Sequence, residues 1–205
     1  MSKDKVATFN SIIHVAKKEF LENGYEKASI RNIAKKVGIV PSALYRHFKD
    51  KETLFSYFVE AALKGYDDLC EYDMSEVNKM LNNKEIDLIW LFSEEQFISR
   101  VKYIYKYYDA FKMLLTCSAG TKYSNFQHEM VTKDVDSTLA IWRKLKESDV
   151  SVREIDEQDF HIITSGLFSA VFEFIIHGYS EDEALKRSEN LSIFFNNGMK
   201  SVIGV

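Results

Sequence analysis

The side chains best suited to chemistry in this sequence cluster between Ser29 and Lys51, close to the amino terminus. This segment, SIRNIAKKVGIVPSALYRHFKDK, places arginine, histidine, tyrosine, serine and lysine side chains on both sides of Gly38. Such groups donate hydrogen bonds to phosphate oxygens and to the edges of bases. A short helix, a tight turn and a second short helix with a polar face fit the major groove of DNA. The segment therefore predicts a nucleic-acid-binding head.

The distribution of charge supports the same prediction. The 205-residue chain has a net charge of −4, which alone gives no reason to expect a nucleic-acid partner. Residues 1–51, however, contain 11 lysines and arginines against five acidic residues, a net charge of +6, whereas residues 52–205 have a net charge of −10. A basic amino-terminal quarter on an acidic body is typical of a small nucleic-acid-binding module attached to a larger domain.

Three helices are expected to position these groups. The first is predicted by apolar residues that recur on one helical face, namely Phe9, Ile12, Ile13, Ala16 and Phe20. Gly24 suits the left-handed position that follows the end of such a helix.

The second and third helices have clear boundary signals. Ser29 is a good N-cap for the second helix, and Gly38 ends it. Pro41 fits the first position of the third helix, where its missing N–H costs nothing. Leu44 and Phe48 are four residues apart and are expected to pack inward, which leaves the polar side chains of this helix on its outer faces.

These residues resemble a known family. The following positions match, in order and spacing, the amino-terminal signature of the TetR family of bacterial transcriptional regulators: Gly24-Tyr25, Ala28-Ser29, Ile33-Ala34, Val37-Gly38, Leu44-Tyr45, His47-Phe48, Lys51 and Leu54. The resemblance covers about residues 7–58, roughly a quarter of the chain. The remainder agrees with the family in length and helical character.

The resemblance implies roles for individual residues. Tyr45, His47 and Lys51 occupy positions that commonly contact phosphates in the family. Arg31, Pro41, Ser42 and Arg46 occupy positions that tend to meet base edges, and Arg46 can pair with O6 and N7 of guanine. The full predicted DNA-binding set is Arg31, Pro41, Ser42, Ala43, Tyr45, Arg46, His47, Lys49 and Lys51. The alternatives are core packing for Tyr45 and a local cap or turn hydrogen bond for His47.

One departure from the family pattern concerns the start of the third helix. Many members have Ser or Thr where this chain has Val40, and Val cannot cap the helix, which costs about 1 kcal/mol. Ala43 likewise lacks a hydroxyl group that is often present there. Both differences predict modest affinity for DNA rather than lost function.

Beyond residue 50 the pattern is helical throughout. Asp50 is predicted to cap a helix from Lys51 to about Tyr72, which joins the head to the body without a flexible linker. Dense apolar and aromatic residues from Glu85 to Leu115 predict a helix central to a bundle. Residues 116–125 are predicted to form a loop.

Helices are also predicted at 128–147, at 155–177 and after a capping box formed by Ser180 and Glu183. The predicted fold is therefore all-α, with about nine helices. Residues 1–50 are assigned to a three-helix helix-turn-helix DNA-binding domain, and residues 51–205 to a helical ligand-binding and dimerisation domain.

The body is rich in aromatic residues, with 11 Tyr, 15 Phe and two Trp in the whole chain. They could line a pocket for an apolar or aromatic small-molecule effector, and ordinary core packing is the alternative for each of them. The predicted ligand-binding set is Trp90, Phe97, Tyr103, Tyr107, Phe111, Trp142, Phe168 and Phe172.

The last two helices are expected to mediate dimerisation, because the TetR resemblance implies a four-helix interface made from these helices of each subunit. The predicted interface residues are Leu167, Val171, Ile175, Leu191, Phe194 and Phe195. Four further apolar residues suggest a second buried face on the same helices: Ile162, Ala170, Ile176 and Ile193. A homodimer also suits DNA, because two-fold symmetry doubles the length of the site.

Several other classes are disfavoured. Cys70 and Cys117 match no metal-binding spacing and are expected to be buried, reduced thiols of a cytoplasmic protein. No apolar run approaches 18 residues and the start lacks a signal-peptide pattern, so neither a membrane partner nor secretion is expected. No cofactor or metal is predicted.

An enzyme is also disfavoured, because the sequence lacks a P-loop, a dinucleotide fingerprint, HExxH and a nucleophile elbow. His128 beside Glu129, and His161 near Asp159, could be imagined as acid–base pairs, and surface or helix-end roles are the favoured alternative. The predicted function is a ligand-responsive regulator, most often a repressor in this family, that binds a palindromic operator as a homodimer. The alternative is an architectural or division-control protein on the same fold that needs no inducer.

Overall fold

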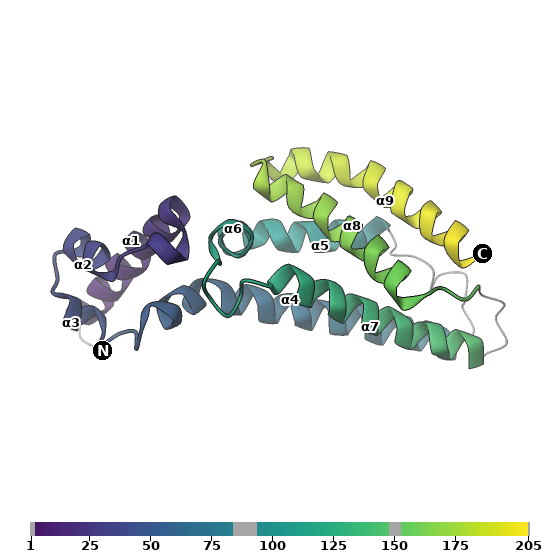
Figure 1. Cartoon of the computed structure of the whole chain (residues 1–205), viewed down its shortest axis with the longest axis horizontal. Coiled ribbons are helices and arrows are strands. Elements are labelled where there is room, and N and C mark those ends of the chain that lie inside the picture. The colour runs from purple at the N-terminus through teal and green to yellow at the C-terminus, as the bar shows by residue number, and fades with distance from the viewer. Residues whose placement is uncertain (1–2, 84–93, 148–152, 205) are drawn as a thin grey trace. The chain divides into compact units, whose positions relative to one another are not determined.

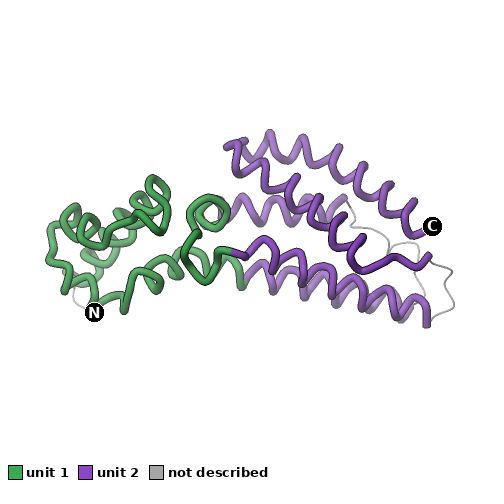
Figure 2. The backbone as a smooth tube through the Cα atoms, viewed as in Figure 1, with its two compact units in different colours: residues 1–64, 109–124 green, residues 65–108, 125–205 purple. Residues whose placement is uncertain are grey.

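The computed structural model describes residues 3–83, 94–147 and 153–204, and these ranges contain nine helices and no strand. The predicted all-α class and helix number are confirmed. The chain divides into two compact units, formed by residues 1–64 with 109–124 and by residues 65–108 with 125–205 (Figure 2).

The first unit contains the amino-terminal helices (Figure 1). They are α1 (Lys3–Lys27), α2 (Ile30–Val37), α3 (Pro41–Leu44), the first half of α4 (Lys51–Asn82) and most of α6 (Tyr108–Cys117). Its core is apolar and aromatic, because Phe20 from α1 and Phe55 from α4 are fully buried and meet edge to face with ring centroids 5.2 Å apart. Such aromatic pairs add stability beyond the area that they bury.

The predicted caps of the helix-turn-helix are present. The Ser29 hydroxyl accepts a hydrogen bond from the Asn32 amide at the start of α2, and Gly38 ends α2 in the left-handed conformation at φ 80°. Asp50 accepts from the Thr53 amide at 2.6 Å and so caps α4. Leu44 is fully buried and Phe48 is 5% exposed, which confirms the predicted inward face of the third helix.

Two predicted boundaries need correction. Gly24 has φ 72° and ψ 165°, which is not the left-handed helical conformation, and helical backbone resumes after it as far as Lys27. The reason is local, because the Ala28 amide bonds the Gly24 carbonyl and closes one more turn. Helix α4 extends to Asn82, about ten residues beyond the predicted end at Tyr72.

The dense apolar region between residues 85 and 115 is not a single helix. Residues 84–93 lie outside the described residues, and the rest forms α5 (Glu94–Lys106) and α6, which are separated at Tyr107. The predicted loop at 116–125 begins after Cys117, as a run of turns.

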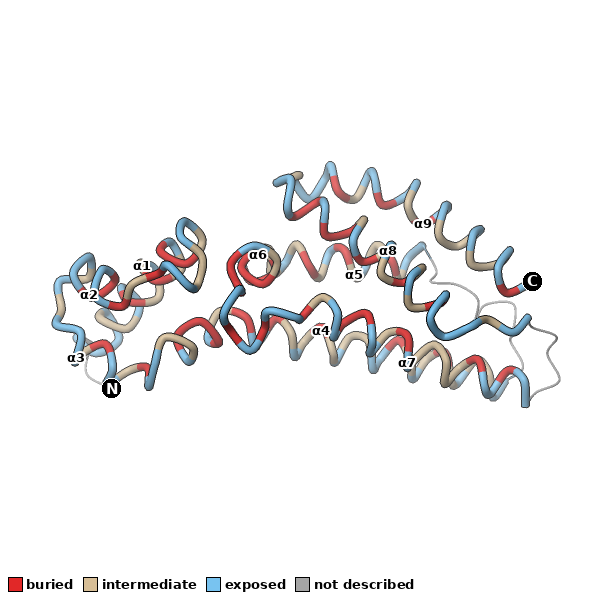
Figure 3. The backbone as a smooth tube through the Cα atoms, in the orientation of Figure 1, coloured by how far each residue is buried: buried red, intermediate tan, exposed pale blue. Residues whose placement is uncertain are grey.

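The second unit is a helical bundle. It consists of the second half of α4 with α5, α7 (Phe126–Glu147), α8 (Glu157–Ile176) and α9 (Glu181–Ile203). Helix α7 packs along α8, and α5 packs along α9. Buried and exposed positions alternate along these helices (Figure 3). The capping box of Ser180 and Glu183 is present at the start of α9, as predicted.

Helix α8 is strongly apolar. Its mean hydropathy reaches 1.4 over 18 residues, so by length and composition it meets the requirements for a membrane-spanning helix, although the sequence contains no uninterrupted apolar run of that length. A bundle helix passes the same test, because it is apolar around much of its circumference. Phe160, Phe172 and Ile175 of α8 are buried within the unit, as expected for a bundle helix.

Candidate functional site

The exposed surface of α3 and the turn that follows it carries most of the predicted DNA-binding side chains. Pro41, Ser42, Arg46 and Lys49 are exposed, and Tyr45 is 49% exposed. Because Leu44 alone anchors α3 to the core, the remaining side chains of this short helix are available to a partner. Arg31 is exposed on α2 and Ala43 is half-buried.

Tyr45 and His47 had alternative structural interpretations. The exposure of Tyr45 argues against core packing. His47 is half-buried and its ring centroid lies 6.0 Å from that of Phe9 on α1, so part of this side chain packs within the head.

The start of α3 has the weak cap that the sequence predicted. Val40 occupies the N-cap position without a side-chain hydrogen bond and is 63% exposed. The Ala43 amide bonds the Val40 carbonyl at 2.9 Å, so only backbone atoms close this turn. A hydroxyl at position 40 has room to point into solvent.

Lys51 has a structural environment that its sequence position did not reveal. Its ammonium donates to the carbonyl oxygens of Tyr25 at 2.7 Å, Glu26 at 3.3 Å and Ala28 at 3.3 Å. It also lies 4.2 Å from the centroid of the Tyr25 ring. Lys51 therefore satisfies carbonyl groups at the carboxyl end of α1, where a positive charge is favourable. Its predicted phosphate contact stays a prediction.

A buried carboxylate joins α1 to α2. Glu19 is 2% exposed, and it accepts hydrogen bonds from the Lys36 ammonium at 2.7 Å and the Ser29 amide at 3.4 Å. Burial opposes ionisation, but the bonds from Lys36 and Ser29 hold the pKa of Glu19 below its usual value. The helix-turn-helix is thus fixed to α1 by a charged contact as well as by apolar packing.

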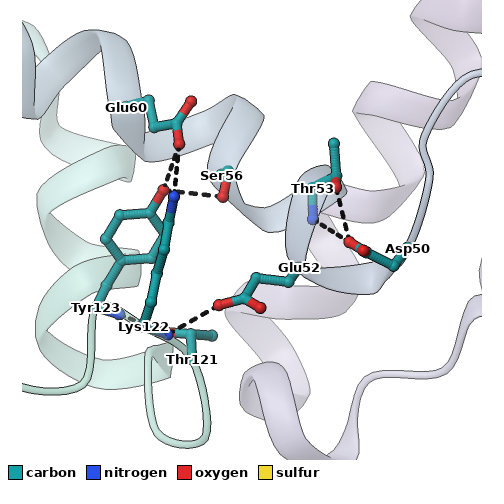
Figure 4. A network of polar contacts seen from close by, with 8 residues as sticks. All are labelled: Asp50, Glu52, Thr53, Ser56, Glu60, Thr121, Lys122 and Tyr123. Carbon is teal, nitrogen blue, oxygen red and sulfur yellow. Dashed lines mark hydrogen bonds and ion pairs between the residues drawn. The ribbon is translucent and has the colours of Figure 1, made fainter.

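A polar network holds the first turns of α4 against the turn at residues 118–124 (Figure 4). Glu52 accepts from the Lys122 amide at 2.9 Å, and Glu60 accepts from the Lys122 ammonium at 3.0 Å. The Tyr123 hydroxyl lies 2.8 Å from both Ser56 and Glu60. Two consecutive residues of the turn therefore fix two turns of α4 within the first unit.

The second unit contains a cavity of about 730 Å³, a size typical of small-molecule sites. Helices α4, α5, α7, α8 and α9 contribute to its wall. Apolar lining is supplied by Met74, Val77, Met130, Trp142, Leu145, Phe160, Phe168 and Met199.

Of the predicted ligand-binding set, Trp142 and Phe168 line this cavity. Phe97 lines only a neighbouring space of about 30 Å³, and Trp90 lies outside the described residues. The other four pack elsewhere: Tyr103 and Tyr107 against each other, Phe111 within the first unit and Phe172 against Phe126. Aromatic content predicted a pocket, but aromatic residues also fill cores, and composition does not separate the two.

The polar part of the cavity wall was not predicted from the sequence. Arg100 of α5 donates to Asp73 of α4 and to Asp134 of α7, at 3.3 Å in each case, and all three line the cavity. A signal was present in the sequence, because Asp73 shares a helical face with Tyr66, Cys70 and Val77. A charge within an apolar stripe marks either a buried pair or a polar group in a cavity.

The two cysteines differ. Cys117 is buried as predicted, whereas Cys70 is half-buried and lines the cavity, so the expectation for Cys70 needs correction. Burial raises the pKa of the Cys70 thiol to about 11, which keeps it protonated and a poor nucleophile at neutral pH. The described residues hold no cluster of metal-ligating side chains.

His128 and His161, which are 33 positions apart in the sequence, lie side by side with ring centroids 5.3 Å apart. They belong to α7 and α8, which pack against each other. Neither residue is among the described residues that line the cavity of about 730 Å³.

The predicted dimer residues fall into two groups. Val171 is 9% exposed and Ile175 is fully buried, so they belong to the core of their own unit rather than to a free face. Val171 lines a small space together with residues of α5, such as Phe97 and Val101. Leu167, Leu191 and Phe195 are half-buried and Phe194 is 69% exposed. Three of the four second-face residues are also exposed: Ile162 at 69%, Ile176 at 47% and Ile193 at 57%.

An exposed polar α3 on a three-helix head is the arrangement of a helix-turn-helix DNA-binding protein, and here it occurs beside a second helical unit that contains a cavity. Residues 12–58 match the family of bacterial regulatory proteins, tetR family. The amino-terminal part of this chain is therefore a TetR-family helix-turn-helix domain, and the resemblance that the motifs indicated is confirmed.

Curated relatives match the same region. An HTH-type transcriptional regulator of Staphylococcus aureus strain bovine RF122 / ET3-1 is 41% identical over 66 residues, which cover 32% of this chain and 36% of the relative. Another from strain USA300 is 43% identical over 63 residues, which cover 31% of this chain and 34% of the relative. The match thus spans about a third of the length of these relatives.

Solved structures match nearly the whole chain. The regulator FadR of Bacillus subtilis, in complex with stearoyl-CoA, has a TM-score of 0.59 at 16% identity and covers 93% of this chain and 98% of its own. The TetR-family regulator PfmR of Thermus thermophilus has a TM-score of 0.55 at 21% identity, covering 91% and 97%. At these identities the likeness shows the fold, which is that of TetR-family regulators.

Proposed function

We propose that this protein is a ligand-responsive transcriptional regulator, which binds a palindromic operator as a homodimer and represses until a small molecule releases it. The observation that carries the proposal is the combination of an exposed α3 face in a TetR-family head with a cavity of about 730 Å³ in the second unit. A purely architectural DNA-binding protein needs the first feature but not the second. The proposed place of action is the cytoplasm, and no catalytic step is involved.

Helix α4 is the proposed route of coupling. Its residues Tyr66, Cys70 and Asp73 line the cavity, whereas Glu52 and Glu60 hold the turn at residues 118–124. A ligand that prefers a different position of α4 would change the spacing of the two recognition helices, which fit successive major grooves about 34 Å apart. Each tenfold loss of operator affinity requires about 1.4 kcal/mol of differential ligand binding.

Dimerisation through α8 and α9 is the second element of the proposal. Exposed apolar residues on both helices support it, since Ile162, Ile193 and Phe194 are each more than half exposed in the protomer. Exposed apolar patches of this kind mark interaction surfaces. A two-fold axis through them would present two α3 helices to the two halves of a palindrome.

Selection of bound sequences from random double-stranded DNA tests the DNA-binding part of the proposal. The expected result is an enriched palindrome, and Arg46→Ala is expected to relax the preference at one base pair of each half-site by about 1–3 kcal/mol. Lys49→Ala is the matched control, because Lys49 is an exposed cation three residues away that is expected to meet phosphate only. Equal losses on operator and random DNA for Arg46→Ala would remove its base-reading role.

Genome-wide footprinting separates the two functions. One or a few sites beside regulated genes support the regulator, whereas many dispersed sites that no small molecule releases support the architectural alternative.

A further inference from the structure

The cavity of the second unit has a charged wall that its apolar residues do not explain. Asp73, Arg100 and Asp134 come from three different helices, and their side chains are only 11–14% exposed. Arg100 lies between the two carboxylates, with its Nε 3.3 Å from Asp73 and its Nη1 3.3 Å from Asp134. Burying charged groups is costly unless they are paired, so these three side chains depend on one another for charge compensation within the cavity wall.

The charges of this cluster do not balance. Among the described residues of this cluster, one guanidinium faces two carboxylates, which leaves a surplus negative charge on side chains that have little access to water. Burial raises the pKa of the Asp134 carboxyl, and Arg100 opposes only part of this effect. A second cation next to Asp134 would complete the compensation of the cluster.

The outer part of the cavity is also acidic. Lys133 and Asp67 form an ion pair at 2.9 Å and cancel each other, whereas Glu71 and Asp136 are exposed lining residues. The described residues that line the cavity therefore include five carboxylates and two cationic side chains. A wall with this balance repels anions and concentrates cations.

The rest of the wall suits the body of an organic molecule. Trp142, Phe160 and Phe168 are all less than 9% exposed and line the cavity together with methionine and aliphatic side chains. The faces of aromatic rings attract cations, with Trp the most effective. Methionine adapts its shape to irregular ligands.

We propose that the effector of this cavity is an organic cation, an amine or quaternary ammonium carried on an apolar or aromatic body. Its charged group would lie beside Asp73 and Asp134, and its body against Trp142, Phe160 and Phe168. The role as effector rests on the proposed function, whereas binding of the cation does not. A fatty carboxylate or an acyl-CoA would bring negative charge to a wall that already has a surplus of it, even though a structural neighbour of the same fold was solved with stearoyl-CoA.

Three probes with the same alkyl chain and different charge provide the test. Decyltrimethylammonium, decanol and decanoate are titrated into the full-length protein by isothermal titration calorimetry below their micellar concentrations, without DNA. The cation is expected to bind at least about tenfold more tightly than either of the other two. This comparison uses the wild-type protein and does not depend on any variant folding correctly.

Two isosteric variants then locate the charge. Asp73→Asn and Asp134→Asn are each expected to weaken decyltrimethylammonium about tenfold and to leave decanol within about twofold. Asp68→Asn is the matched control. Asp68 is exposed on α4, the helix that carries Asp73, but it does not line the cavity. Circular dichroism melts confirm that the variants are folded.

The outcomes separate this inference from the proposed function. Decanoate that binds as tightly as the cation, binding of the cation that ignores both aspartates, or no binding of the cation overturns the inference. Operator release by some other small molecule would still leave the regulator intact in each of those cases. Selective binding of the cation to a protein that binds no operator would support the inference and refute the proposed function.

Discussion

The contact between Glu19 and Lys36 gives a sharp test of how the helix-turn-helix is held. Glu19→Gln keeps the shape of the side chain but removes its charge. The Glu19 side chain is only 3% exposed, whereas the Lys36 side chain is 51% exposed, so the lysine regains water when its partner is neutral. The substitution therefore removes charge-assisted hydrogen bonds to a buried carboxylate, and it does not leave Lys36 as an unpaired buried cation.

Hydrogen bonds to charged groups contribute about 1.5–3 kcal/mol, and since the glutamine oxygen still accepts a bond, we expect a loss of about 2 kcal/mol. For a chain of this size, 1 kcal/mol corresponds to about 2–4 °C in melting temperature, so the expected decrease is about 4–8 °C. Thermal unfolding followed by circular dichroism measures it. Faster amide hydrogen exchange in α2 would show that the loss is local to the head.

Glu22→Gln is the matched control for this substitution. Glu22 lies on the same helix and faces Lys18 at 3.7 Å, but its side chain is 51% exposed. Exposed ion pairs between helix positions i and i+4 contribute about 0.3–0.5 kcal/mol, so the control is expected to melt within about 2 °C of the wild type. If both variants lose the same stability, burial of Glu19 is not the cause and the reasoning fails.

The pH dependence gives an independent check on Glu19. Its pKa is lower in the folded protein than in the unfolded chain, so ionised Glu19 stabilises the fold at neutral pH. This contribution is lost as the pH falls through the folded-state pKa, because the carboxyl is then protonated in both states. The stability difference between the wild type and Glu19→Gln should therefore shrink below about pH 4.3, the usual glutamate value. A difference that stays constant to lower pH would contradict the charged contact.

Three other substitutions test the start of α3, the Lys51 contacts and the exposed face of α9. Val40→Ser should supply the missing N-cap of α3 and stabilise the head by about 1 kcal/mol, measured by thermal unfolding, and an unchanged melting temperature would contradict the capping argument. Lys51→Met should lower the melting temperature even without DNA, because three carbonyl groups lose their donor, whereas an effect on DNA affinity alone would favour the phosphate role. Phe194→Glu should shift the protein from dimer to monomer in analytical ultracentrifugation, and an unchanged dimer would exclude this part of α9 from the interface.

The head was the most predictable part of the protein. Its boundaries depend on residues close in sequence, such as the Ser29 cap, the left-handed Gly38 and Pro41 at the first position of α3. Such local signals act within one helical turn, so they can be interpreted from the sequence without knowledge of the rest of the fold. Gly24 shows their limit, because a glycine with positive φ can interrupt a helix without ending it.

Lys51 shows a different limit. Its place in the family signature implied a contact with phosphate, but the structure surrounds its ammonium with three carbonyl oxygens and the Tyr25 ring. These partners are 23–26 residues away in the sequence. Nothing in the spacing of the segment could reveal them, since they are brought to Lys51 by the packing of α1 against the start of α4.

The sequence by itself determined the class of fold, the helix-turn-helix and the side chains that face outward on α3, because each depends on helical periodicity and on caps. Only the tertiary structure decided which side chains enclose the cavity. Asp73 and Asp134 lie 27 and 34 residues from Arg100, and they meet only when α4, α5 and α7 pack together. An aromatic residue is equally apolar in a core and in a cavity wall, so composition could suggest a pocket but could not reveal its charge.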